Sequence, residues 1–425
     1  MMRIRPSLVV VACALLLLLR WLPSQGKNSP GLSYDAAACT LAHTLESTPV
    51  VPAAELSQNS TAEVRLFWWY RFDGRRRSAR HAQRFTCSDG LRCVSNSRKS
   101  AFADSHGVVV WVGPGRPACL PPRRAQHTWV MEFSESPAIY KELLDSDFTR
   151  RFDLKVSHEL DSDVVLTALH PLVEGGAIPP STWLRLSADE AIAGRSAVVW
   201  IASYCPAHSR RAELVRHLQH ALPSSVPLLS IGRCMHNHDE PLLIAKQADG
   251  GGNASTWMSK IRVLSQYTFC LIAENSIARD YVTEKLFHAF AAGCLPVYYG
   301  TTDVSQFLPT PTAAIQVLSF NSVQELRNEL VALAGDSSAY RARMAWRRDA
   351  ALVGAWWARM QAVTNSATTA TKPAIFCAIC SAVARHRSRA SGGRLGSDRR
   401  GGLHGSPVPK DFVWPPLLAP PASKR

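Results

Sequence analysis

Acidic side chains are scarce in this sequence. It has 33 Asp and Glu against 48 Lys and Arg over 425 residues, which leaves a formal net charge of +15. Such a charge favours an anionic partner, and nucleic acid is the first class that it suggests. From Arg385 onward, however, nine Lys and Arg accompany only two acidic residues, so nearly half of the excess lies in the tail. The net charge therefore does not by itself indicate a basic folded site.

The sequence also lacks an apolar run of about 20 residues, the usual length of a membrane-spanning helix. Its longest uncharged apolar stretch is 8–19, preceded by Arg3 and Arg5. A secretory signal peptide has the same basic-then-apolar form. No clear small-x-small cleavage site follows, so we favour an uncleaved signal-anchor at 7–22 with a cytosolic tail at 1–6. A cleaved signal peptide is the alternative. Either way the remainder enters the secretory lumen, which argues against nucleic acid.

Cysteine usage agrees with an oxidising compartment. Of the 11 cysteines, Cys13 lies in the apolar run, and the other ten form an even number that allows disulfide pairing. Two sequons begin at Asn59 and Asn253 and could be glycosylated in such a compartment.

Composition divides the chain into a stem, two domains and a tail. Residues 23–62 are rich in Ser, Pro, Ala and Gln and are expected to be a stem. A first domain is expected at 63–190 and a second at 191–382. The tail, 383–425, is rich in Arg, Gly and Pro and is expected to be disordered.

Apolar runs predict an α/β fold in both domains. In the first domain, short runs are typical of buried parallel strands, and they lie at 64–72, 107–113, 128–133 and 162–169. In the second domain, strands alternate with helices, which predicts right-handed βαβ units in a doubly wound sheet. The expected strands there are 197–204, 226–232, 268–275 and 294–300, and the expected helices are 209–222, 256–267, 282–293, 322–335 and 338–363.

Basic residues stand at the start of two of these helices. Ser209 is the expected N-cap of one, with Arg210 and Arg211 in its first turn, and Lys285 lies in the first turn of another. Cations at a helix amino end are unfavourable by up to about 1 kcal/mol each. A bound diphosphate would reverse the sign, because helix N–H groups and cations then act together. Each side chain alone could bend into solvent, but the combination favours an anionic ligand.

Glu284, beside Lys285, lies off the apolar face of its helix. It could accept hydrogen bonds from a ribose diol. It could equally be a favourable carboxylate in a first helical turn.

The segment 269–300 resembles the signature of the α1,3/α1,4-fucosyltransferases, glycosyltransferase family ten. The matching positions are Glu274-Asn275, Asp280 to Lys285, Ala292-Gly293, Pro296-Val297 and Gly300, whereas Ala273 departs from the usual Phe. Weaker similarities are found at 135–137, 157–168, 203–214, where Tyr204 departs from the usual Asn, and 377–380. The segment 230–239 is most similar to the core-type branch of the family.

The resemblance implies a GT-B architecture of two Rossmann-like domains, with GDP-fucose as donor and inversion at the anomeric carbon. It implies no required cofactor, although a divalent cation could stimulate the reaction. The expected product is fucose in α1,3 linkage on an N-acetylglucosamine-containing glycan or glycoprotein. The expected location is the Golgi membrane, with type II topology and the catalytic part in the lumen, and the enzyme could form a homo-oligomer.

The same resemblance assigns roles to single residues. Inversion by direct displacement needs a general base, for which Glu135 is our choice and Glu132 the competitor. The donor-binding residues carried over from the family are Arg211, Glu274, Asn275, Tyr281, Glu284 and Lys285. Of these, Arg211 and Lys285 would stabilise the leaving diphosphate.

Two further motifs have metal-like spacing. Asp161 and Asp163 form an Asp-x-Asp pair, but they lie in the first domain, on the acceptor side and not in the donor-binding domain. The Cys and His residues at 234–239 have spacings that a zinc site could use, but no second ligand cluster accompanies them. No metal site is therefore predicted. We expect Cys234 to pair with Cys205, and the Cys-x-x-Cys of Cys377 and Cys380 to be a structural disulfide rather than a redox pair.

Two other functions remain open on the sequence alone. Some relatives of the family suggest protein O-fucosylation. A catalytically silent lumenal protein that binds a nucleotide sugar would be consistent with the departures at Ala273 and Tyr204. A nucleic-acid-binding role for the basic tail ranks third.

Overall fold

The computed structural model describes residues 42, 44–46, 63–70, 82–113, 119–166, 195–240, 253–363 and 372–391. Both sheets and the helices that cover them belong to one compact unit, Pro49–Arg116 and Arg123–Arg425. The expected anchor at 7–22 and the sequon at Asn59 lie outside the described residues. Among the helices that are described, none is both long enough and apolar enough to cross a membrane.

The first sheet has seven strands in the order β2-β3-β1-β4-β5-β6-β7. All neighbouring strands run parallel except β2, which is antiparallel to β3. Its central strand β4 is apolar, and its first four residues are buried, as expected of a strand covered on both faces. The strands are β1 (Glu63–Tyr70), β2 (Gln83–Thr86), β3 (Arg92–Asn96), β4 (Gly107–Trp111), β5 (Thr128–Glu132), β6 (Leu154–Ser157) and β7 (Val164–Val165), with the short helix α4 (Ser146–Thr149) before β6.

The second sheet has five parallel strands in the order β12-β11-β10-β8-β9. The chain builds outward from β8 to β9, crosses back over β8, and continues through β10 to β12 on the other side. The direction of winding therefore reverses between β8 and β10. The strands are β8 (Arg195–Trp200), β9 (Leu228–Ser230), β10 (Tyr267–Ala273), β11 (Leu295–Tyr299) and β12 (Ile315–Gln316).

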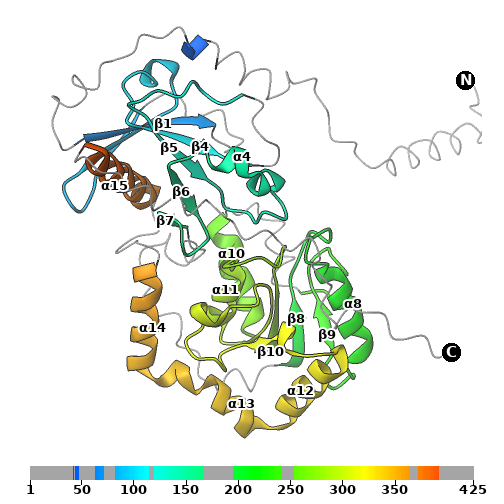
Figure 1. Ribbon diagram of the computed structural model, residues 1–425. Coiled ribbons are helices and arrows are strands. Elements are labelled where there is room, and N and C mark those ends of the chain that lie inside the picture. Colours follow the sequence, from blue (N-terminus) through cyan, green and yellow to red (C-terminus); the bar gives the residue numbers. More distant parts are fainter. Residues whose placement is uncertain are drawn as a thin grey trace, which may run out of the picture. The chain divides into compact units, whose positions relative to one another are not determined.

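Helices cover both faces of this second sheet, so it is doubly wound. Buried side chains of α8, α12 and α13 pack with one set of strand residues, and those of α10, α11 and α14 pack with the other. Figure 1 shows α8 on one side of β8 and β10, and α10 and α11 on the opposite side. The helices are α8 (Arg211–Ala221), α10 (Asn253–Leu264), α11 (Glu284–Ala292), α12 (Val323–Gly335), α13 (Ser337–Met344) and α14 (Ala350–Val363).

Local residue choices set several of these helix boundaries. Gly293 ends α11 with φ of 81°, in the left-handed region that glycine adopts at low cost. The expected helix 338–363 is instead two helices separated by a short 3₁₀ turn. Asp349 accepts a hydrogen bond from the Leu352 N–H at 2.9 Å and so starts α14 afresh. The turn lets Trp346 pack against Trp356, with ring centroids 6.2 Å apart.

The expected strand at 162–169 is reduced to β7 in the described residues. The hydroxyls of Ser157 and Ser162 lie 2.7 Å apart, and Asp163 accepts a hydrogen bond from the Lys155 N–H at 2.8 Å. These local bonds hold the chain in a turn until β7 begins.

The prediction that the tail becomes disordered at 383 was wrong for its first residues. Helix α15 spans Lys372–Ser391, and Phe376, Ile379, Cys380 and Val383 form a buried stripe on it. This stripe packs on the first sheet, where Figure 1 shows α15 beside the strands. Residues 372–382, assigned from the sequence to the second domain, therefore pack with the first.

Two disulfides join α15 to that sheet. Cys377 is bonded to Cys87 and Cys380 to Cys93. A disulfide between Cys377 and Cys380 themselves, the pairing that the Cys-x-x-Cys motif suggested, is therefore wrong. The apolar stripe of α15 faces the sheet, which brings Cys380 within reach of Cys93 in β3 and Cys377 within reach of Cys87, the residue after β2. A further bond, Cys270–Cys294, links the second sheet to the segment after α11, and no sequence pattern predicted it.

Non-reducing peptide mapping of the purified protein tests this connectivity. We expect one crosslinked peptide pair joining Cys87 to Cys377 and another joining Cys93 to Cys380. Replacing both Cys377 and Cys380 by Ser should lower the free energy of unfolding by about 2–5 kcal/mol, because two long loops are no longer closed in the unfolded chain. A peptide closed internally between Cys377 and Cys380 would contradict the structure.

Candidate functional site

A pocket opens at the carboxyl ends of β8 and β10, where the winding of the second sheet reverses. This switch point is the usual ligand site of an open α/β sheet, because neighbouring crossover connections diverge there. The pocket has a volume of about 240 Å³ and is lined on its polar side by Ser203, Tyr204, Arg211, Lys260, Asn275 and Lys285.

Arg211 is fixed at the wall of this pocket by three oxygen acceptors. Its guanidinium donates to the carbonyl of Ala273 at 3.1 Å, the side chain of Asn275 at 2.6 Å and the carbonyl of Tyr204 at 2.8 Å. All three partners are uncharged, so the positive charge is not cancelled by a direct ion pair. Burial lowers the pKa of Arg211 from its usual value, although the guanidinium stays protonated at neutral pH. The sequence-based choice of Arg211 thus falls on a preorganised cation in the pocket.

The start of α8 differs from the expected capping. Its N-cap is Arg210, in the left-handed conformation with φ of 55°, and not Ser209. The Ser209 hydroxyl instead donates to the Glu274 carbonyl at 2.6 Å. Arg210 turns toward Glu213 and forms an ion pair with it. Of the two arginines expected to face a ligand, only Arg211 does so.

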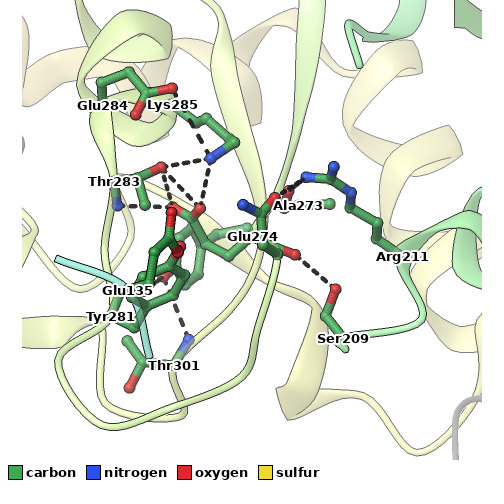
Figure 2. Close-up of polar contacts among 12 residues, drawn as sticks. Glu135, Ser209, Arg211, Ala273, Glu274, Tyr281, Thr283, Glu284, Lys285 and Thr301 are labelled. Carbon is green, nitrogen blue, oxygen red and sulfur yellow. Dashed lines mark hydrogen bonds and ion pairs between the residues drawn. The ribbon is translucent and has the colours of Figure 1, made fainter. Parts of the chain in front are cut away.

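Lys285 faces a carboxylate of its own chain. Its ammonium lies 2.9 Å from Oε2 of Glu274 and donates to the Thr283 hydroxyl at 2.7 Å, as Figure 2 shows. Burial lowers the pKa of Lys285 and Glu274 raises it, with a net shift upward. The ammonium therefore stays charged and held in place while it lines the pocket.

Glu274 is fully buried and serves as an internal anchor. Its carboxylate accepts hydrogen bonds from the backbone N–H of Thr283 at 2.8 Å and from the Thr283 hydroxyl. The negative charge thus lies at the amino end of α11, where the helix favours an anion. This explains how a lysine can occupy the first turn of that helix. The carboxylate supports Lys285 rather than lining the pocket itself.

Glu284 lies beside this cluster without joining it closely. Its carboxylate is 3.9 Å from the Lys285 ammonium, and about a third of its side chain (36%) is exposed. Burial raises the pKa of Glu284, but Lys285 and Lys260 lower it by more, so that the net shift is downward. Both expected roles, a ribose ligand or a first-turn carboxylate, are compatible with this position.

Tyr281 connects the second lobe, the second sheet with its helices, to the first lobe, which is the first sheet with α15. Its hydroxyl donates to Oε2 of Glu135 at 2.5 Å (Figure 2), and Glu135 lies three residues beyond the end of β5. Burial, with Glu135 next in effect, raises the pKa of Tyr281, so the phenol stays protonated and can only donate to a carboxylate. Within the described part of the chain, Oε1 of Glu135 has no hydrogen-bond partner. Glu132, the competing base, is the last residue of β5.

His158 packs on the same tyrosine and was not among the sequence-based candidates. Its ring centroid lies 5.1 Å from that of Tyr281 and 5.8 Å from that of Phe133. Neither ring nitrogen finds a hydrogen-bond partner among the described residues, and burial lowers the pKa of His158 to about 3. The imidazole is therefore neutral at pH 7 and acts as packing for Tyr281.

A group of charges also joins the lobes next to Tyr281. Arg279 forms an ion pair with Asp161 at 2.5 Å, and Asp161 is also bonded to Lys155 at 2.5 Å. Asp280 accepts a hydrogen bond from the Leu160 N–H at 3.0 Å, which holds Asp280 at a left-handed φ of 56°. The aspartate with metal-like spacing thus serves as a structural ion-pair partner.

Cys205 and Cys234 form a disulfide immediately after the pocket residue Tyr204. This is the pair that the sequence suggested. His236, from the segment with zinc-like spacing, bonds to Asp239 at 3.0 Å. Among the described residues no group of three or more His, Cys, Asp or Glu side chains is placed to hold a metal ion. The sequon residue Asn253 is the first residue of α10.

A parallel doubly wound sheet with a cationic pocket at its switch point is the arrangement of a nucleotide-binding α/β domain. Residues 193–394 match the family model described as glycosyltransferase family 10 (fucosyltransferase) C-term. Over these residues, slightly less than half of the chain, the protein is similar to glycosyltransferase family 10.

The curated relatives include both kinds of fucosyltransferase considered from the sequence. GDP-fucose protein O-fucosyltransferase 3 of Bos taurus is 28% identical over 63% of this chain and 62% of its own length. Alpha-(1,3)-fucosyltransferase B of Drosophila melanogaster is 27% identical over 65% of this chain and 60% of its own length. Matches to these two relatives thus span about three fifths of their lengths. A solved structure of an α1,3-fucosyltransferase with GDP is 16% identical, covering 78% of this chain and 98% of its own, with a TM-score of 0.45.

Replacing Glu274 by Gln tests its role as the anchor of Lys285. The variant would leave a buried ammonium without its carboxylate, so we expect the free energy of unfolding to fall by about 3–5 kcal/mol in chemical denaturation. Glu284→Gln is the matched control, because that side chain is partly exposed and sits at the same helix end. Its cost should stay below about 1 kcal/mol. Equal effects of the two substitutions would rule out the anchoring role.

Proposed function

We propose that this protein is an inverting fucosyltransferase that uses GDP-fucose as donor. The observation that carries the proposal is the hydrogen bond between Glu135 and Tyr281. It brings a carboxylate of the first lobe to the segment that leads into Lys285 and the cationic pocket. An inverting transferase needs both parts, an anion site for the leaving diphosphate and a base on the acceptor side. The family 10 match over residues 193–394 supports fucose as the transferred sugar.

In this proposal the pocket binds the nucleotide part of the donor. Arg211 and Lys285 would contact the diphosphate and stabilise the negative charge that builds on it as the sugar leaves. Asn275 holds the guanidinium of Arg211 at 2.6 Å and would thereby fix its orientation. Glu284, partly exposed beside Lys285, would accept hydrogen bonds from the ribose hydroxyls.

Glu135 would act as the general base. As the acceptor oxygen attacks C1 of fucose, Glu135 would take the proton of the acceptor hydroxyl through Oε1. The bond from C1 to the β-phosphate oxygen would break with its electron pair going to GDP. Tyr281 already donates to Oε2, so it would orient the carboxylate without blocking the other oxygen. No metal ion takes part in this scheme, because the cations of the pocket carry the charge of the leaving group.

The acceptor that the relatives favour is a protein hydroxyl. Protein O-fucosyltransferase 3 from several vertebrates is among the curated relatives, with identities of 26–29%. The second candidate is the N-acetylglucosamine of a glycan in α1,3 linkage, supported by the Drosophila relative and by the similarity to the core-type signature. We further propose a Golgi location with the catalytic part in the lumen, which the four disulfides between described residues support.

Glu135→Gln tests the catalytic assignment. We expect the variant to lose fucose transfer by at least about 100-fold, because the amide cannot accept the proton. Its affinity for GDP, measured by calorimetry, should stay within a few-fold of the wild type. Glu132→Gln is the matched control and should keep most of its turnover. Normal turnover in Glu135→Gln would exclude Glu135 as the base, and GDP binding without any turnover in the wild type would favour a silent binding protein.

Acceptor choice is tested by supplying the wild-type chain with GDP-fucose and two sets of acceptors. One set is a panel of folded secreted proteins and the other an array of N-acetylglucosamine-containing glycans. We expect labelled fucose on Ser or Thr, released by β-elimination. Transfer to the glycan array alone, in α1,3 linkage, would replace the protein acceptor by the second candidate.

A further inference from the structure

A third cation lines the pocket, and the sequence did not single it out. Lys260 lies in the last two turns of α10, and its side chain forms part of the pocket wall together with Arg211 and Lys285. These three residues come from three helices, α10, α8 and α11. They therefore approach the carboxyl ends of β8 and β10 from different directions.

The three cations differ in how they are held. Arg211 is fixed by neutral oxygen acceptors, and Lys285 is paired with the buried carboxylate of Glu274. Within the described part of the chain, the Lys260 ammonium has neither a hydrogen-bond partner nor an ion-pair partner. The side chain is half-buried and borders the pocket, so its ammonium is available to the oxygens of an anionic ligand. Partial burial lowers the pKa of Lys260, while Glu284 opposes that shift.

The charge balance of the pocket depends on this residue. Arg211, Lys260 and Lys285 line the pocket, and the carboxylates Glu274 and Glu284 lie next to Lys285 without lining it, so this group of five carries one net positive charge. Without Lys260, the two remaining cations and the two carboxylates would balance. The group would then attract a diphosphate less strongly, although two cations would still line the pocket.

The neighbours of Lys260 on α10 differ from it in their surroundings. Val263 and Leu264 are buried in the core beneath the sheet, and Ser259 is buried as well. Arg262, two residues further on, is exposed on the outer side of the same helix. A lysine with a purely solvent-facing role would be expected at the position of Arg262 rather than in the pocket wall.

We propose that Lys260 binds the diphosphate of the nucleotide donor directly and gives the pocket its net positive charge. This inference rests on the proposed function, since it assigns a further binding residue to the same site. Arg211 and Lys285 are fixed before the ligand arrives, whereas Lys260 is free to turn onto the phosphate oxygens. It would contribute mainly to affinity for the diphosphate and only indirectly to the proton transfer at Glu135.

The test uses the full-length chain and calorimetric titration with GDP, GMP and guanosine. In Lys260→Met we expect the affinity for GDP to fall about 10–100-fold, the loss of one charge-assisted hydrogen bond. The affinity for GMP should fall less, and that for guanosine should not change. The KM for GDP-fucose should rise accordingly, with kcat changed by only a few-fold.

Matched variants separate this role from a structural one. Arg262→Met removes a positive charge from the same helix and should leave all three affinities unchanged, whereas Lys260→Arg should retain most of the GDP affinity. If Lys260→Met fails to fold by circular dichroism, Lys260→Gln replaces it. A wild type that binds GDP beside a Lys260 variant that binds it equally well would overturn the inference and leave the proposed function standing. A wild type that binds no GDP would overturn both.

Discussion

The site depends on one buried carboxylate, that of Glu274 at the end of β10. It accepts hydrogen bonds from the backbone N–H of Thr283 at the start of α11 and from the ammonium of Lys285. The carbonyl of the same residue accepts a hydrogen bond from the hydroxyl of Ser209, just before α8. A single residue thus joins a strand end to the starts of two helices. Because each helix carries a pocket cation, the spacing of those cations is set by an internal ion pair and not by the ligand. Such preorganisation lowers the cost of ordering the site when a nucleotide binds.

The strands and helices of the second sheet were largely predictable because they follow from patterns of neighbouring residues. Fully buried parallel strands are short continuous apolar runs, and the helices between them carry an apolar stripe. The sequence could also indicate that Lys285 needs a negative partner, since a cation in the first turn of a helix is unfavourable alone. It could not indicate that the nearest such partner is Glu274, eleven residues earlier, because that contact depends on how the loop between them folds back.

The features that the sequence missed depend on long-range contacts. The disulfide partners of α15 lie 287 and 290 residues away, and the second half of the helix was assigned to a tail whose composition is rich in Arg, Gly and Pro. The contact between Glu135 and Tyr281 spans 146 residues and was approached only through resemblance to a family. Lys260 was missed for a different reason: one lysine on an ordinary amphipathic helix carries no signal until the fold places it beside two other cations. The local sequence patterns therefore predicted the strands and helices, whereas the contacts that form the site could be seen only in the folded structure.

The return of α15 to the first sheet has a consequence for how the protein can be divided. The first lobe consists of two pieces of chain, one before the second sheet and one after it, crosslinked at two points. An exchange of acceptor-side lobes between relatives would have to carry both pieces, because a graft of the amino-terminal piece alone would lack the helix that covers its sheet and would leave Cys87 and Cys93 without their partners. During synthesis the first sheet also cannot receive its covering helix until the second lobe has left the ribosome, because α15 follows that lobe in the chain.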